Sequence, residues 1–174
     1  MSTKMYLFMI VVCTITLTSI LAADNPPPQK NRYPHTASAK INNGAVQVTI
    51  DFAKVPKENR PPETSHFKAD RPLTSVTVKY SGLEAGKDFT YFTDPECDHL
   101  VQFTRNRLQD LSGKHGVLKG NGPAETPLAV YYDAHLPLTY SQRGIVGKSV
   151  VIHDPTGAAV ACGNVVDPTA PAVA

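Results

Sequence analysis

The chain has 174 residues, of which 41% are apolar and 18% charged, so it is long enough to bury one globular core and too apolar for a disordered chain. Seventeen basic against fifteen acidic side chains give a net charge of only +2, without a basic run, which argues against a nucleic-acid binder. Fifteen prolines, eleven glycines and no tryptophan argue against a helical bundle.

The first 23 residues have the pattern of a secretory signal peptide. Lys4 supplies the positive start, residues 6–21 are largely apolar and carry no charge, and two alanines at 22 and 23 suit a cleavage site. The alternative is a membrane anchor, but roughly 16 apolar residues fall short of the ~20 that a span needs. We therefore expect a secreted, extracellular protein with no membrane span after cleavage.

The body of the chain has the pattern of short strands. Apolar and polar residues alternate along one segment, which predicts a half-buried strand from 44 to 55. The apolar positions are Val46, Val48, Ile50 and Phe52, and the polar positions between them are Gln47, Thr49 and Asp51. Runs of β-branched and aromatic residues predict further strands at 76–80, 89–93, 128–132, 149–153 and 160–166. Residues 56–72 carry four prolines and many charges, which predicts a loop, and 106–111 is the one predicted helical turn. The pattern predicts an all-β domain of seven or eight antiparallel strands, closed as a Greek-key barrel or packed as a sandwich.

This domain is expected to run from 37 to 166. Residues 24–36 precede it as an exposed, Pro-rich leader, and residues 167–174 follow it as a C-terminal tail. Cleavage removes Cys13, so Cys97 and Cys162 remain. Two cysteines in a secreted domain predict one disulfide, since two free thiols would be unusual outside the cell.

Five segments resemble, in the same order, parts of the copper/zinc superoxide dismutases. They are residues 44–52, 82–89, 110–116, 144–153 and 161–164, and the segment 110–116 resembles the secreted copper-only branch of fungi and oomycetes. The resemblance implies a superoxide dismutase-like barrel, a Cys97–Cys162 disulfide, and copper held by several histidines, which suit that metal.

The copper ligands implied by this resemblance are mostly missing. The family's His-x-His pair falls on Thr90 and Phe92, neither of which replaces an imidazole. His153 matches the last copper ligand, but because the pair at 90 and 92 is missing we favour a hydrogen-bonded histidine of the barrel surface. His99, two residues after Cys97, is either a relic of the bridging ligand or an exposed loop histidine, and we favour the loop histidine.

The zinc site and the substrate-guiding charge are also altered. Asp110 matches the family's zinc aspartate, but Arg107 stands where a histidine is expected, so we expect no zinc. Asp110 is predicted instead to cap the following turn. Ala159 occupies the position of the arginine that guides the anionic substrate in the family.

The resulting interpretation is a secreted superoxide dismutase-like domain that has lost its copper site and its dismutase activity. It would serve as a binding or structural module for an unidentified partner, such as a cell-surface or host component. The rival hypothesis is a functioning copper-only dismutase that uses His153 with His99, His115 or His135. A third is a low-affinity copper buffer without turnover. We predict His115 to be structural, and His35 and His66 to be solvated.

Overall fold

The computed structural model describes residues 33–97, 110–126 and 129–170. The predicted signal peptide and most of the predicted leader lie outside these ranges. The described residues form eight strands and one short α-helix, together with two 3-10 turns in the loop between the second and third strands. The bounds are β1 Thr36–Asn43, β2 Val46–Val55, η1 Lys57–Asn59, η2 Pro62–Thr64, β3 Leu73–Ser81, β4 Asp88–Asp94, α1 Leu111–His115, β5 Leu118–Lys119, β6 Ala129–Asp133, β7 Ser149–His153 and β8 Ala159–Val166.

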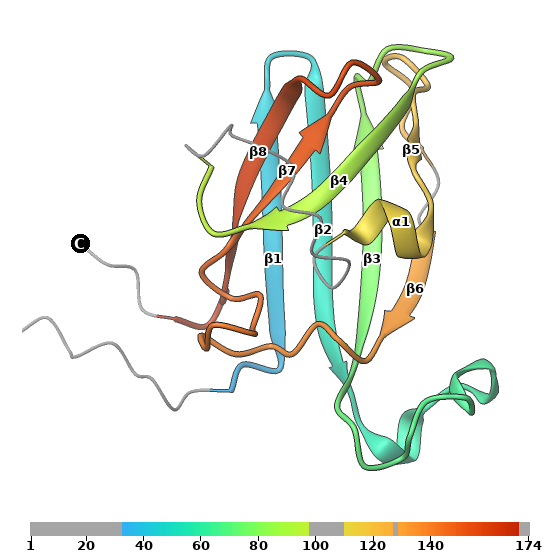
Figure 1. Cartoon of the computed structure of the whole chain (residues 1–174), viewed down its shortest axis with the longest axis vertical. Coiled ribbons are helices and arrows are strands. Elements are labelled where there is room, and N and C mark those ends of the chain that lie inside the picture. The colour runs from blue at the N-terminus through green and yellow to red at the C-terminus, as the bar shows by residue number, and fades with distance from the viewer. Residues whose placement is uncertain (1–32, 98–109, 127–128, 171–174) are drawn as a thin grey trace, which may run out of the picture.

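The strands form one antiparallel sheet in the order β5-β4-β7-β8-β1-β2-β3-β6. The β3–β4 and β6–β7 connections cross from one end of this order to the other, and Figure 1 shows β4 crossing in front of β2 and β3. The predicted all-β antiparallel class is confirmed. Among the described residues no ladder joins β5 to β6, so the eight strands curl into a half-barrel, in agreement with the barrel or sandwich that we predicted.

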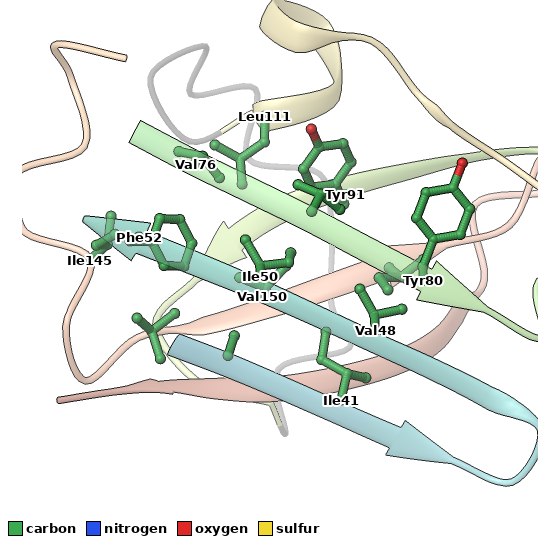
Figure 2. Close-up of a cluster of buried hydrophobic side chains, with 14 of the residues drawn as sticks. Ile41, Val48, Ile50, Phe52, Val76, Tyr80, Tyr91, Leu111, Ile145 and Val150 are labelled. Carbon is green, nitrogen blue, oxygen red and sulfur yellow. The ribbon is translucent and has the colours of Figure 1, made fainter. Parts of the chain in front are cut away.

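The hydrophobic core fills the inside of this curl. Alternate residues of β2 point inward, and Val48, Ile50 and Phe52 are at most 2% exposed. Strands from the other side of the curl contribute Tyr91 and Val150, so both halves of the sheet share one core (Figure 2). The alternation predicted for residues 44–55 is therefore confirmed by burial.

The N-terminal strand β1 was not predicted from the sequence. Its inward residues Ala37, Ala39 and Ile41 are fully buried, but two of them are alanines, whose strand preference is weak. The predicted exposure of the leader is also wrong at its end, because Pro34 is buried and the carbonyl of His35 accepts a hydrogen bond from Lys54 N at 2.8 Å. The ordered domain thus begins before residue 37.

We predicted a helical turn at 106–111, of which residues 106–109 lie outside the described ranges. In the described part, α1 begins at Leu111, directly after Asp110. Residues 56–72 form a loop as predicted, with only the two 3-10 turns inside it. Within the described ranges, no helix is long and apolar enough to cross a membrane.

The predicted disulfide is present. Cys97 follows β4 and Cys162 lies in β8, and their Cα atoms are 5.7 Å apart across a sequence separation of 65. The bond therefore fastens the segment after β4 to β8, which lies two strands away from β4 in the sheet.

Candidate functional site: the outer face of β4 and β7

Three side chains predicted to matter for copper lie together on β4 and β7. Thr90 is directly opposite His153 in the antiparallel β4–β7 pair, and Phe92 is opposite Val151. Thr90 and Phe92 share one face of β4, because residues two apart in a strand point the same way. The Phe92 ring stands edge-on to the His153 ring, with centroids 5.4 Å apart and planes inclined at 73°. The positions that resemble the family's ligand pair thus border His153.

His153 is half-buried, which affects its protonation. Burial lowers the pKa of His153, while the negative charges of Asp154 and Asp94 act in the opposite direction. Since burial is the larger effect, the neutral imidazole is favoured at neutral pH. Neutral imidazole is the form that can bind a metal, so protonation of His153 is no obstacle to ligation.

The connection from β7 to β8 brings no positive charge to this face. Asp154 closes a tight turn by accepting hydrogen bonds from Thr156 N and Ala158 N at 2.8 and 3.0 Å. Ala159, at the position that resembles the guiding arginine, pairs with His153 at an irregularity in the β7–β8 ladder. Among the described residues, the carboxylates of Asp154 and Asp94 place negative charge near His153.

Asp110, at the position that resembles the family's zinc aspartate, is the N-cap residue of α1. Its Oδ1 accepts hydrogen bonds from Gly113 N at 2.7 Å and from Ser112 Oγ at 2.8 Å, at the start of α1. This confirms the predicted capping role, which satisfies one of the unpaired N–H groups of the first helical turn.

The structure also contains a polar cluster that the sequence reading missed. Asp133, at the end of β6, is 3% exposed, and its Oδ2 lies 3.0 Å from both Lys114 Nζ and His115 Nε2. Its Oδ1 accepts a hydrogen bond from His135 N at 2.6 Å and lies 3.3 Å from His135 Nδ1. The His115 ring stacks on Tyr131 with a centroid distance of 3.7 Å. His115 therefore has the structural setting that was predicted for it.

Protonation of Asp133 is governed by this cluster. Burial raises the pKa of Asp133, but the hydrogen bonds from His115, from the His135 backbone N–H and from Lys114 together outweigh burial and lower it. The carboxylate is therefore ionised at any ordinary pH and fastens α1 to the end of β6.

The remaining candidates do not complete a metal centre within the described part of the chain. His99 and Arg107 lie outside it, and His35 and His66 are exposed, as predicted. Among the described residues, no group of three or more His, Cys, Asp or Glu side chains could hold a metal. The described surroundings of His153 include a threonine, a phenylalanine and the carboxylates of Asp94 and Asp154. They supply no second imidazole and do not fit a copper site that needs several.

Sequence comparison connects the chain to known dismutases. No protein-family model matches it. It is 27% identical over 179 residues to the Cu-Zn cell surface superoxide dismutase 6 of Candida albicans, an alignment that covers 91% of this chain and 54% of that relative. By sequence, the chain is therefore similar to this Candida superoxide dismutase. It spans about half the length of this curated relative.

Structural comparison supports the same fold. The copper(II) form of superoxide dismutase 5 of Candida albicans matches with a TM-score of 0.55 at 21% identity, covering 81% of this chain and 98% of the other. The clock protein EA4 matches with a TM-score of 0.53 at 15% identity, covering 78% of this chain and 96% of the other. At these identities the structures support the superoxide-dismutase fold alone. The predicted family resemblance and fold class are thus confirmed, whereas activity must be argued from the side chains.

Proposed function

We propose that this protein is a secreted superoxide dismutase-like domain without dismutase activity, retained as a binding or structural module. The observation that carries the proposal is the composition of the face around His153, where Thr90 and Phe92 occupy the positions that resemble two copper ligands. Copper that cycles between oxidation states needs several donors in a fixed geometry with one open position. One imidazole bordered by a hydroxyl and a phenyl ring supplies one of those donors.

Electrostatics supports the same proposal. Superoxide is an anion, and a cation in a cleft raises the rate at which an anion arrives. Beside His153, Ala159 stands at the position of the family's guiding arginine, while Asp94 and Asp154 contribute negative charge. These two carboxylates disfavour the approach of superoxide to His153.

An extracellular location is part of the proposal. The relative from Candida albicans is named as a cell surface protein. The Cys97–Cys162 disulfide agrees with an oxidising compartment, since disulfides persist mainly outside the cytosol. The apolar N-terminal stretch, with its signal-peptide pattern, is the expected route of secretion. We expect the binding partner at a cell surface or in a host.

The rival hypothesis, a copper dismutase that recruits other histidines to His153, lacks support from the described histidines. His115 and His135 both contact Asp133, which occupies them in the cluster at the end of β6. In this proposal they hold α1 in place.

The test is to measure copper and turnover in protein collected from its secretion route. We expect well under one copper per chain and no superoxide turnover above that of free copper. An active dismutase measured in parallel provides the reference, and the His153→Ala variant provides the matched control. Stoichiometric copper together with turnover that His153→Ala abolishes would establish the rival hypothesis and refute ours. Stoichiometric copper without turnover would indicate a copper buffer.

A further inference from the structure

The chain contains two Asn-Gly pairs among the described residues, and both asparagines are exposed. Asn43-Gly44 lies at the turn between β1 and β2, and Asn121-Gly122 follows β5. An asparagine before glycine is prone to intramolecular attack, because glycine has no Cβ to hinder the approach of its own nitrogen to the asparagine side chain. We propose that Asn43 is a site of spontaneous deamidation in the folded protein, whereas the fold protects Asn121.

The reaction needs no reagent except water. The backbone nitrogen of the following glycine loses its proton and forms a bond to the asparagine Cγ, and ammonia leaves, which gives a five-membered succinimide. Water then opens the ring at one of its two carbonyls and gives aspartate or isoaspartate. Nothing is oxidised or reduced, and one water replaces one ammonia overall.

The fold restrains the peptide of Gly122 on both sides. Its N–H donates to the Leu83 carbonyl at 2.8 Å, and its carbonyl accepts from Gly82 N at 2.6 Å. The attacking Gly122 nitrogen must leave the Leu83 carbonyl before it can approach the Asn121 side chain, and the bond to the Gly122 carbonyl holds the next peptide in place. Attack at Asn121 therefore requires local unfolding.

Gly44 is far less restrained. It lies in the turn between β1 and β2 with φ 59°, and a Cβ built on it would meet nothing within 4 Å. Among the described residues, no hydrogen-bond acceptor contacts the Gly44 N–H. Two contacts restrain the reacting asparagine: its backbone pairs with Val46 at the end of the β1–β2 ladder, and its Nδ2 donates to the Val160 carbonyl in an exposed hydrogen bond of 2.7 Å. Neither contact occupies the attacking Gly44 nitrogen, whereas the Gly122 nitrogen must first leave the Leu83 carbonyl.

Deamidation of Asn43 would change the contact it makes with β8. The Asn43 amide ties the tip of the β1–β2 hairpin to Val160, which neighbours Ala159 in the strand that pairs with His153. A carboxylate cannot donate to the Val160 carbonyl and repels it, and isoaspartate also lengthens the backbone. The reaction thus adds a negative charge and loosens this contact as the secreted protein ages.

The test is to incubate the folded chain at 37 °C and mildly alkaline pH and to follow both asparagines by peptide mass spectrometry. Fragmentation of the peptides separates Asn43 from its neighbour Asn42. We expect Asn43 to react about tenfold or more faster than Asn121, since local opening must precede attack at Asn121. The matched control is the reduced chain in urea, in which both sites should react at similar rates. Equal rates in the folded protein, or an intact Asn43 while the unfolded chain reacts, would overturn the proposal.

A second measurement tests the consequence. Asn43→Asp and Asn121→Asp introduce the same charge at the two sites. Amide hydrogen exchange at the tip of the β1–β2 hairpin should be faster in Asn43→Asp than in Asn121→Asp. Equal exchange in the two variants would show that the Asn43–Val160 hydrogen bond does not restrain the hairpin.

Discussion

Thr90 and His153 face each other directly across the β4–β7 pair, and the Phe92 ring stands at the edge of the His153 ring. Residues directly opposite in an antiparallel pair have their Cβ atoms about 5 Å apart, which is within reach of a shared metal. The backbone register therefore suits a pair of imidazoles at 90 and 153. What separates this face from a copper site is the chemistry of side chains 90 and 92.

The double variant Thr90→His, Phe92→His should bind copper(II) more tightly than the starting protein, by about tenfold or more, because three imidazoles would replace one. Isothermal titration with copper(II) measures the change. The matched control is Thr77→His, Lys79→His, which places the same His-x-His spacing on the solvent-facing side of β3, opposite Asp51 and Thr49. Equal gains in both variants would show that the β4–β7 face contributes no third ligand.

Replacing Cys97 and Cys162 with serine should lower the free energy of unfolding by about 2–5 kcal/mol. The cross-link spans a sequence separation of 65, so its removal gives the unfolded chain much more freedom. Urea unfolding of the variant measures this loss, and the starting protein treated with a reductant should show a similar decrease. A variant as stable as the oxidised protein would mean that the bond contributes nothing to stability.

Much of the fold could be predicted because strand signals are local. The strand β2 could be predicted from alternation alone, through Val48, Ile50 and Phe52. The strand β1 could not be predicted, because its buried residues Ala37 and Ala39 are not typical strand formers. The curl of the sheet depends on pairing between distant strands, for which one sequence offers no periodic signal.

Of the two groups of polar side chains, the face around His153 could be predicted from the sequence and the Asp133 cluster could not. Thr90, Phe92 and His153 could be placed on one face through the family resemblance, and the structure brings them together. The Asp133 cluster could not be predicted, because Lys114 and His115 are 19 and 18 residues away from Asp133 and meet it only once α1 packs against β6. No motif with such a spacing indicates this contact.

Asp133→Asn should destabilise the domain by about 2–3 kcal/mol at pH 7, because it removes the charge that pairs with Lys114 in a buried position. The pKa of Asp133 is lowered in the folded protein, so its contribution to the free energy of unfolding is fully present above the pKa of an unfolded aspartate, about 4. This contribution declines as the pH falls from that value toward the pKa of Asp133 in the folded protein. The difference between the starting protein and Asp133→Asn should therefore be smaller at pH 3 than at pH 5.

Urea unfolding at these three pH values measures the difference. Asp51→Asn is the matched control, because Asp51 is exposed and accepts a hydrogen bond from Ser38 Oγ at 2.7 Å. It should cost well under 1 kcal/mol at every pH. Losses of equal size in the two variants would contradict a special role for the buried carboxylate.

Gly82→Ala should be among the most damaging single-methyl changes in the chain, and Gly86→Ala a mild one. Both glycines have positive φ angles, 79° and 78°, in the turn between β3 and β4, so alanine costs about 1 kcal/mol of backbone strain at either position. At Gly82 the new Cβ would also overlap the Ala45 carbonyl oxygen, whereas at Gly86 it would meet nothing within 4 Å. The Gly82 backbone cannot retreat freely, because its N–H donates to the Gly122 carbonyl at 2.6 Å and the next residue, Leu83, is 1% exposed. We expect Gly82→Ala to cost about 3 kcal/mol or more in urea unfolding. If the two variants lose the same amount of stability, the close approach of Gly82 to Ala45 does not constrain the fold.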